Sequence, residues 1–152
     1  MKKRGVLVFC LLSPLWAAPL WAQSNAVMDS LLSQKQASFG DAVYMVMSAV
    51  KLVPDSASPD DAIKSLKGAA WGIKILGAGS PITLGEYAFL LMRAFKMHGG
   101  IMYGLFPGPR YAARELAYDR LIYGDASPYR TLSGREVVEL LGSVMRYEES
   151  RS

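Results

Sequence analysis

The amino-acid sequence predicts an all-α protein, and three observations support this fold class. Three apolar segments, residues 38–52, 83–97 and 133–147, each begin with Ser or Thr and have an acid three residues later. We call these segments the box helices. Each of them follows a segment whose apolar residues recur at the helical spacing of three and four. No part of the chain alternates as convincingly as a half-buried strand would.

Residues 1–22 have the pattern of a secretory signal peptide. Cations at residues 2–4 precede a short apolar run that contains two prolines, and small residues follow. We therefore expect cleavage near Ala22, with a membrane contact only through a retained leader. Lipid attachment at Cys10 is the other option, but the residues before it are not small. The sequence predicts an exported protein of the periplasm or cell envelope, with one domain over residues 23–152.

Removal of the leader changes the charge and the available chemistry. The net charge of +4 includes three leader cations, so the remainder has 14 Lys and Arg against 13 Asp and Glu, or +1. This balance gives no indication of nucleic-acid binding. The only cysteine also leaves with the leader, which removes disulfides and thiol chemistry from the domain. A domain of this length is long enough to be held together by its apolar core.

Each box helix is predicted to begin with a capping box. The three pairs are Ser38 with Asp41, Thr83 with Glu86, and Ser133 with Glu136. In such a box the hydroxyl accepts a hydrogen bond from the N3 backbone N–H, and the N3 carboxylate accepts one from the N-cap N–H. A buried helix needs this start because water cannot reach its first N–H groups. Asp41 is shorter than glutamate, so we expect the first box to be the weakest.

The segments before the box helices are predicted to be partner helices. The first spans residues 25–36, and its apolar face consists of Val27, Met28, Leu31 and Leu32. The second, residues 58–73, opens with an N-cap serine and a proline at N1, and Trp71 falls on its apolar side. The third, residues 108–122, opens with a proline and has the same spacing. The sequence thus predicts three consecutive pairs, each a partner helix followed by its box helix.

The box helices differ in how much of their surface is apolar. The first two are apolar nearly all round, which predicts positions at the centre of the bundle. The third has a one-sided stripe, formed by Val137, Leu140, Leu141, Val144 and Met145. We therefore expect the third helix to bury a single face.

A partner helix, a loop and then Ile-Thr-x-x-Glu opening an apolar helix resembles the S-layer homology (SLH) domain. Residues 77–95 and 111–145 carry the resemblance best, and with the first box helix it covers most of residues 25–147. The resemblance implies a pseudo-threefold bundle of three helix-pair repeats. In that family an arginine directly after the box Ser or Thr reaches acidic groups of cell-wall polysaccharide. The equivalent residues here are Phe39, Leu84 and Gly134, so the motif arginine is absent.

The resemblance also implies a ligand site in the grooves between repeats. Its candidate residues are Thr83, Glu86, Ser133, Arg135 and Arg110. Arg135 lies one position beyond the motif arginine and offers a partial substitute in the third repeat. The expected function is a non-catalytic binding or structural role in the cell envelope, with cell-wall glycan or peptidoglycan as partner and no cofactor.

The loop at residues 98–111 supports a second hypothesis. It contains glycines and prolines among five large apolar residues, which are Ile101, Met102, Tyr103, Leu105 and Phe106. We favour a loop that folds back over the bundle. The alternative is an exposed contact for another envelope protein.

No arrangement of residues predicts catalysis or a metal site. His98 is the only histidine, and it follows a predicted helix end without other ligands at suitable spacing. Residues 125–136 have acids at the first and last positions of a calcium loop, but Arg130 stands where a glycine is needed. Glu115 and Asp119 are flanked by arginines and are typical of a solvated helix face. We therefore expect a protein that is not an enzyme.

Overall fold

The part of the chain that the structure describes, residues 22–152, is all-helical, which confirms the predicted fold class there. The structure is a computed structural model, and it describes side chains from residue 25 onward. The predicted signal peptide and Cys10 lie outside the described residues, apart from Ala22. The helices in this range are α1 (Ala22–Ser33), α2 (Phe39–Ala49), α3 (Pro59–Ala69), α4 (Leu84–Ala94), α5 (Ile101–Leu105), α6 (Pro109–Tyr118) and α7 (Gly134–Glu149).

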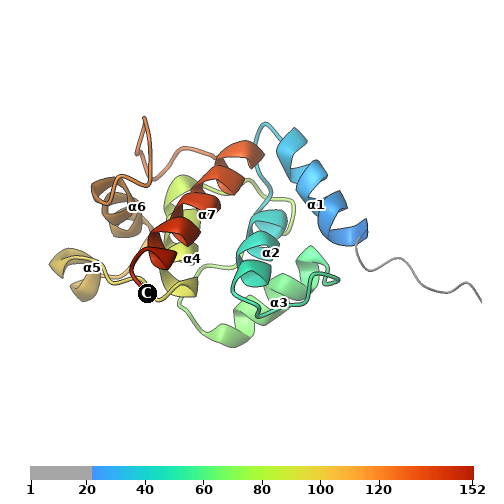
Figure 1. Cartoon of the computed structure of the whole chain (residues 1–152), viewed down its shortest axis with the longest axis horizontal. Helices are drawn as coiled ribbons and strands as arrows, with labels where there is room; N and C mark the ends of the chain where they lie inside the picture. Colours follow the sequence, from blue (N-terminus) through green and yellow to red (C-terminus); the bar gives the residue numbers. More distant parts are fainter. Residues whose placement is uncertain (1–21) are drawn as a thin grey trace, which may run out of the picture.

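The three box helices are α2, α4 and α7, and they lie together in the middle of the molecule with the other helices around them (Figure 1). Helix α4 is the most enclosed, with buried residues on every side; they are Leu84, Gly85, Tyr87, Ala88, Phe89, Leu90, Leu91 and Met92. Helix α7 buries one side only. Both observations agree with the apolar patterns of these helices. Met145, at the edge of the predicted α7 stripe, is 37% exposed.

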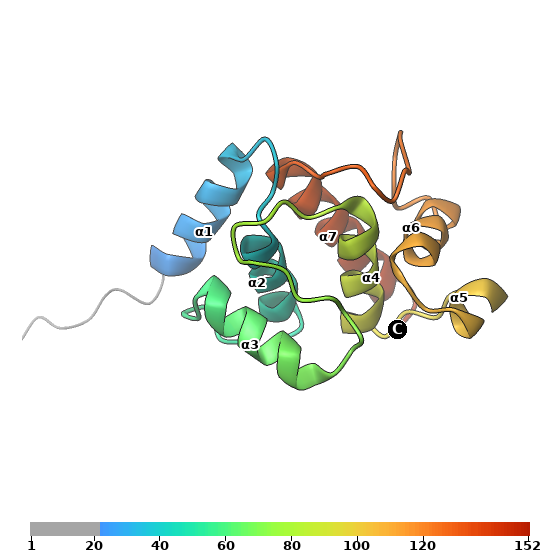
Figure 2. The ribbon, with the colours of Figure 1, turned by 180° about the vertical axis from the view of Figure 1, so that it is seen from behind.

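The predicted pairing of helices is wrong for the second and third pairs, and in the first pair α1 contacts α2 but packs mainly against α7. Each box helix packs mainly against the partner helix that follows it in the chain, α2 against α3 and α4 against α6, and α7 packs against α1. Helices α3 and α4 make no close contact, nor do α6 and α7. The view from behind shows α3 beside α2 and α6 beside α4 (Figure 2). The reason lies in the extended segments between the helices. The segment after α3 crosses the start of α2, and the segment after α6 crosses the start of α4.

These crossings are visible in the backbone hydrogen bonds at the starts of α2 and α4. The N–H of Phe39 donates to the carbonyl of Ser80 at 2.7 Å, and that of Leu84 donates to Arg130 at 2.8 Å. At the start of α7, the N–H of Gly134 donates to Gln34 at 3.0 Å. The first N–H groups of a helix have no partner within the helix. The segment that precedes the next box supplies that partner from outside.

The three box helices start around a closed set of hydrogen bonds, which we call the backbone ring. It joins Ala37, Ile82 and Leu132, each directly before an N-cap and each at most 1% exposed. Ala37 donates to the carbonyl of Leu132 at 2.7 Å, Leu132 to Ile82 at 3.1 Å, and Ile82 to Ala37 at 3.0 Å. Because each residue donates once and accepts once, these buried backbone groups are all satisfied.

Three predicted details at the periphery differ from the structure. Leu32 is 45% exposed, because α1 turns only Leu31 fully into the core. Helix α3 ends at Ala69, since Ala70 adopts a left-handed conformation (φ 51°), so Trp71 lies beyond the helix and is half-buried. The predicted loop at 98–111 contains the short helix α5, which extends from the edge of the bundle (Figure 1).

Candidate functional site

The second and third capping boxes form as predicted. In the second, Glu86 Oε2 accepts hydrogen bonds from the Thr83 N–H at 3.0 Å and from its hydroxyl at 2.8 Å. In the third, Glu136 Oε2 accepts the same two bonds from Ser133, both at 2.8 Å. The returning bond to each hydroxyl is 3.3 Å long. These carboxylates therefore hold helix starts.

The first box is incomplete, and a residue that the sequence analysis missed completes it. The Ser38 N–H donates to the side chain of Gln34 at 2.8 Å, and the amide of Gln34 donates to Asp41 at 2.7 Å. An aspartate can close a box, since Asp61 does so with Ser58 at the start of α3. At the start of α2, the Gln34 side chain bridges the Ser38 N–H and the Asp41 carboxylate instead. A glutamine four residues before an N-cap was the available signal.

The three residues that directly follow the box Ser or Thr, where the sequence resemblance would place an arginine, all lie in packed positions. Phe39 and Leu84 are each 1% exposed, so their side chains belong to the core. A Cβ atom on Gly134 would overlap the carbonyl group of Leu31, because the end of α1 crosses the start of α7 there. No side chain fits at that position without a backbone shift.

A small groove lies where the start of α4 meets α7, and we call it the box groove. Its volume is about 90 Å³, and its lining includes Leu84, Leu121, Tyr123, Arg130, Glu136 and Leu140. Arg130 donates from Nη1 to Glu136 Oε1 at 2.6 Å and from Nε to the carbonyl of Asp125 at 2.6 Å. The arginine thus links the Glu136 carboxylate to the backbone carbonyl of Asp125.

The Glu136 carboxylate stays charged in this setting. Burial raises its pKa, but hydrogen bonds from the Ser133 N–H and hydroxyl and from the Arg130 guanidinium outweigh burial, so the pKa lies below its usual value. The Arg130–Glu136 pair is partly exposed, with 23% and 39% of the two side chains accessible. The groove therefore presents a fixed guanidinium, with part of its charge compensated, beside apolar side chains.

Of the five predicted ligand residues, Thr83 and Ser133 directly follow residues of the backbone ring, and none of the five lines the box groove. Thr83 and Glu86 lie at the start of α4, and Ser133 and the exposed Arg135 at the start of α7. Arg110 is exposed on the first turn of α6, which approaches α4 through the neighbouring Pro109. Comparison of the chain with protein-family models, with curated proteins and with solved structures found no significant match to any of them.

The sequence analysis missed Arg130 and Tyr123 as groove residues. In the sequence, Arg130 is notable only as an unfavourable residue at the glycine position of a calcium-loop pattern. Its position three residues before the third box was the available signal, because Ser80 occupies the same position before the second box and contacts the start of α2. Tyr123 had no signal in the sequence.

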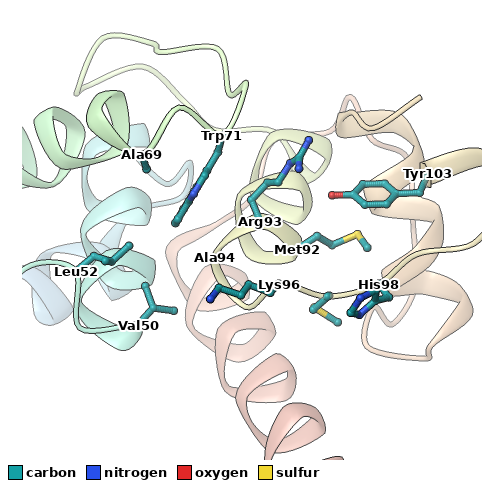
Figure 3. Close-up of a pocket in the computed structure, with 11 residues that line it drawn as sticks. Val50, Leu52, Ala69, Trp71, Met92, Arg93, Ala94, Lys96, His98 and Tyr103 are labelled. Carbon is teal, nitrogen blue, oxygen red and sulfur yellow. The ribbon is translucent and has the colours of Figure 1, made fainter. Parts of the chain in front are cut away.

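A larger hollow lies at the other ends of α2 and α4, and we call it the end pocket (Figure 3). It has a volume of about 670 Å³. Its walls are mostly apolar and include Val50, Leu52, Trp71, Met92, Met97 and Tyr103. Three basic side chains also line it, and they are Arg93, Lys96 and His98.

Helix α5 closes one side of the end pocket through Tyr103. The ring of Tyr103 packs edge-on against Phe89 of α4, with centroids 6.3 Å apart. The chain approaches it so closely that a Cβ on Gly99 would lie 2.7 Å from the Tyr103 ring. Burial raises the pKa of the Tyr103 phenol, and the charge of Glu115 adds to this, while Arg93 acts in the opposite direction. The hydroxyl is thus protonated at neutral pH.

The other members of the predicted interaction loop point outward. Ile101 is 81% exposed, Leu105 65% and Phe106 62%, and Met102 is 46% exposed. Tyr103, at 7%, is the only one of the five that anchors the segment. We expected this loop to fold back over the bundle, and of the five apolar residues only Tyr103 does so.

Within residues 22–152, none of the helices has the length and hydropathy that a bilayer span requires. In the same range no three His, Cys, Asp or Glu side chains are grouped as metal ligands. His98 is exposed and lies just beyond the end of α4.

Proposed function

We propose that this chain is a non-catalytic, exported cell-envelope protein whose domain is an SLH-like module of three helical repeats. The observation that carries the proposal is the backbone ring. Three capped helices start around it, and each is crossed by the segment that leads to the next box. This cyclic arrangement supports a pseudo-threefold repeat protein.

We propose cell-wall glycan or peptidoglycan as the partner, bound at the box groove. In this chain Leu84 fills the motif-arginine position, and Arg130 places a guanidinium in the groove beside it. A guanidinium suits the carboxylate groups of an acidic glycan. Tyr123, which is 83% exposed at the groove, offers an apolar face for a sugar ring.

Retention on purified cell-wall polysaccharide tests the proposal. We expect Tyr123→Ala to lower retention at least threefold, because the stacking face is lost, with no change in melting temperature. Tyr118→Ala is the matched control, since Tyr118 is equally exposed at 85% but lies outside the groove. Equal retention of the two variants and the wild-type protein would reject the box groove.

Charge substitutions separate Arg130 from the arginine that the sequence analysis favoured. We expect Arg130→Gln to abolish retention and Arg135→Gln to leave most of it, because Arg135 does not line the groove. Arg130 also pairs with Glu136, so the melting temperature of each variant is measured alongside. No retention of the wild-type protein at low salt would reject glycan binding altogether.

A protein-interaction role in an envelope complex is the second candidate, and the exposure of α5 favours it. Ile101 and Leu105 are among the most exposed large apolar side chains of the described chain. Contiguous exposed apolar surface of this kind marks contact sites. Replacing Ile101 and Leu105 by serine removes this surface and leaves the Tyr103 anchor in place. Loss of a specific co-purifying envelope protein, with glycan retention unchanged, would favour this role.

A further inference from the structure

The end pocket has the lining of a small-molecule site and lies apart from the box groove. It opens at the C-terminal ends of α2 and α4, whereas the box groove and the backbone ring lie at helix starts. Its volume of about 670 Å³ is within the range of ligand pockets. Trp71 and two methionines, Met92 and Met97, contribute to its apolar wall. Methionine side chains adapt to flexible apolar ligands.

The charge of this pocket is one-sided. Arg93, Lys96 and His98 line it, and no carboxylate does. The ion pairs found in residues 22–152 join Lys64 to Asp61 and Arg130 to Glu136, so Arg93 has no carboxylate partner there. Its guanidinium lies 5.1 Å over the ring of Phe89.

Arg93 is also incompletely hydrogen-bonded. Its Nε atom is buried and has no hydrogen-bond partner among the described residues. Burying an N–H group without a partner is costly, and Arg93 is partly exposed, so the rest of its guanidinium remains free to pair with an anion. Figure 3 shows Arg93 between Trp71 and Tyr103, with the Tyr103 hydroxyl directed toward it.

Two carboxylates lie in the surroundings, and neither occupies this position. Glu115 accepts a hydrogen bond from the Gly100 N–H at 2.9 Å and does not line the pocket. Glu148 lines a separate hollow of about 40 Å³ together with Lys96 and His98. The Arg93 side of the pocket thus stays positive.

We propose that the end pocket binds a small amphipathic carboxylate, an acyl chain with a single acid group. The chain lies against Trp71, Met92 and Met97, and the carboxylate pairs with Arg93, with Lys96 at the rim. A ligand with both an apolar chain and an anionic group matches an apolar wall that lies next to unpaired cations. The proposal is independent of glycan binding.

Titration with decanoate, and with decanol as the uncharged counterpart, tests this proposal. The protein is purified from a host that exports it, in whatever processed form results. Methyl NMR of the methionines locates the ligand. We expect decanoate to shift the Met92 and Met97 signals and leave Met145, outside the pocket, unmoved. Decanol is expected to bind at least tenfold more weakly, because a charge-assisted pair is lost.

Variants test the role of the arginine. Arg93→Gln is expected to weaken decanoate binding about tenfold and leave decanol unchanged. Arg114→Gln, an exposed arginine of α6 outside the pocket, is the matched control and keeps wild-type affinity. If Arg93→Gln does not fold, Lys96→Gln at the exposed rim replaces it, with about a threefold loss expected.

Any of four results would overturn the proposal. Three of them are equal affinity for decanoate and decanol, wild-type decanoate binding in the arginine variant or its replacement, and methyl shifts that do not single out Met92 and Met97. Binding to phosphatidylglycerol vesicles without any binding of decanoate would also overturn it, because a lipid surface and not a free acid would then be recognised.

Discussion

The two ends of α2 and α4 are held in different ways. At the starts, side chains and crossing segments supply hydrogen-bond partners to the first N–H groups, and the backbone ring closes the arrangement. At the other ends, each helix stops by a local turn. Lys51 and Lys96 adopt left-handed conformations (φ 58° and 53°), and Leu52 and Met97 donate back to the last turn, each at 2.9 Å.

This difference follows from the hydrogen-bonding needs of the two helix ends. The starts are buried among other segments, so their donors need partners within the protein. The ends satisfy their carbonyls locally and need no crossing segment. They therefore leave space between them, and that space is the end pocket. One end of the bundle is closed by its own backbone, and the other carries the end pocket.

The largest expected effect is at the closed end, in Gly134→Ala. The added Cβ would meet the backbone of Leu31, which cannot move without displacing α1. We expect a loss of roughly 3 kcal/mol in the free energy of unfolding, measured by urea denaturation. Gly68→Ala is the control, because nothing lies near that site in α3, and it should stabilise by about 0.5–1 kcal/mol. Equal effects of the two variants would contradict the close approach of α1 and α7.

The next effect compares the complete box of α4 with the incomplete box of α2. Thr83→Ala removes an N-cap that is bonded to Glu86 in both directions, and we expect a loss of about 1 kcal/mol. Ser38→Ala should cost about half as much, because Gln34 still bridges the Ser38 N–H to Asp41. Urea midpoints in the same buffer give the difference. A larger loss for Ser38→Ala would contradict the role assigned to Gln34.

A smaller and opposite effect is expected at the open end. Lys51→Gly relieves a left-handed conformation that costs an L-residue about 1 kcal/mol, offset in part by the backbone entropy of glycine. We expect a gain of about 0.5 kcal/mol in unfolding free energy. Lys67→Gly, inside α3, is the control and should lose about 1 kcal/mol. Destabilisation by both changes would show that Lys51 does more than end the helix.

The smallest effect is the pH dependence that Glu136 contributes. Because its pKa is lowered in the folded protein, its stabilisation is present above the usual value of 4.5 and is lost as pH falls through the lowered value. Glu136→Gln should therefore lose less stability on acidification than the wild type, measured by urea denaturation at several pH values. Asp61, whose pKa is lowered by hydrogen bonds from Ser58 and Lys64, leaves a residual dependence. Identical acid profiles of Glu136→Gln and the wild-type protein would contradict this.

The capping boxes and the enclosed central helices were predictable because both depend on local chemistry. A hydroxyl and an acid three residues apart cap a helix whatever surrounds it, and an apolar circumference predicts enclosure. Gln34 and Arg130 were not predictable in the same way, because their partners are chosen by where the chain passes. The helix pairing was predicted wrongly for the same reason. Each partner helix was expected to pack against the box helix that follows it, but α3 and α6 pack against the box helix that precedes them.

By itself, the sequence determined the all-α fold class, the starts of the box helices and which of them lie innermost, because these depend on spacing and on burial of apolar side chains. The tertiary structure alone decided the backbone ring, the crossing segments, the box groove and the end pocket. Each of these brings together residues far apart in the chain, and the backbone hydrogen bonds that join them leave no pattern in the side chains.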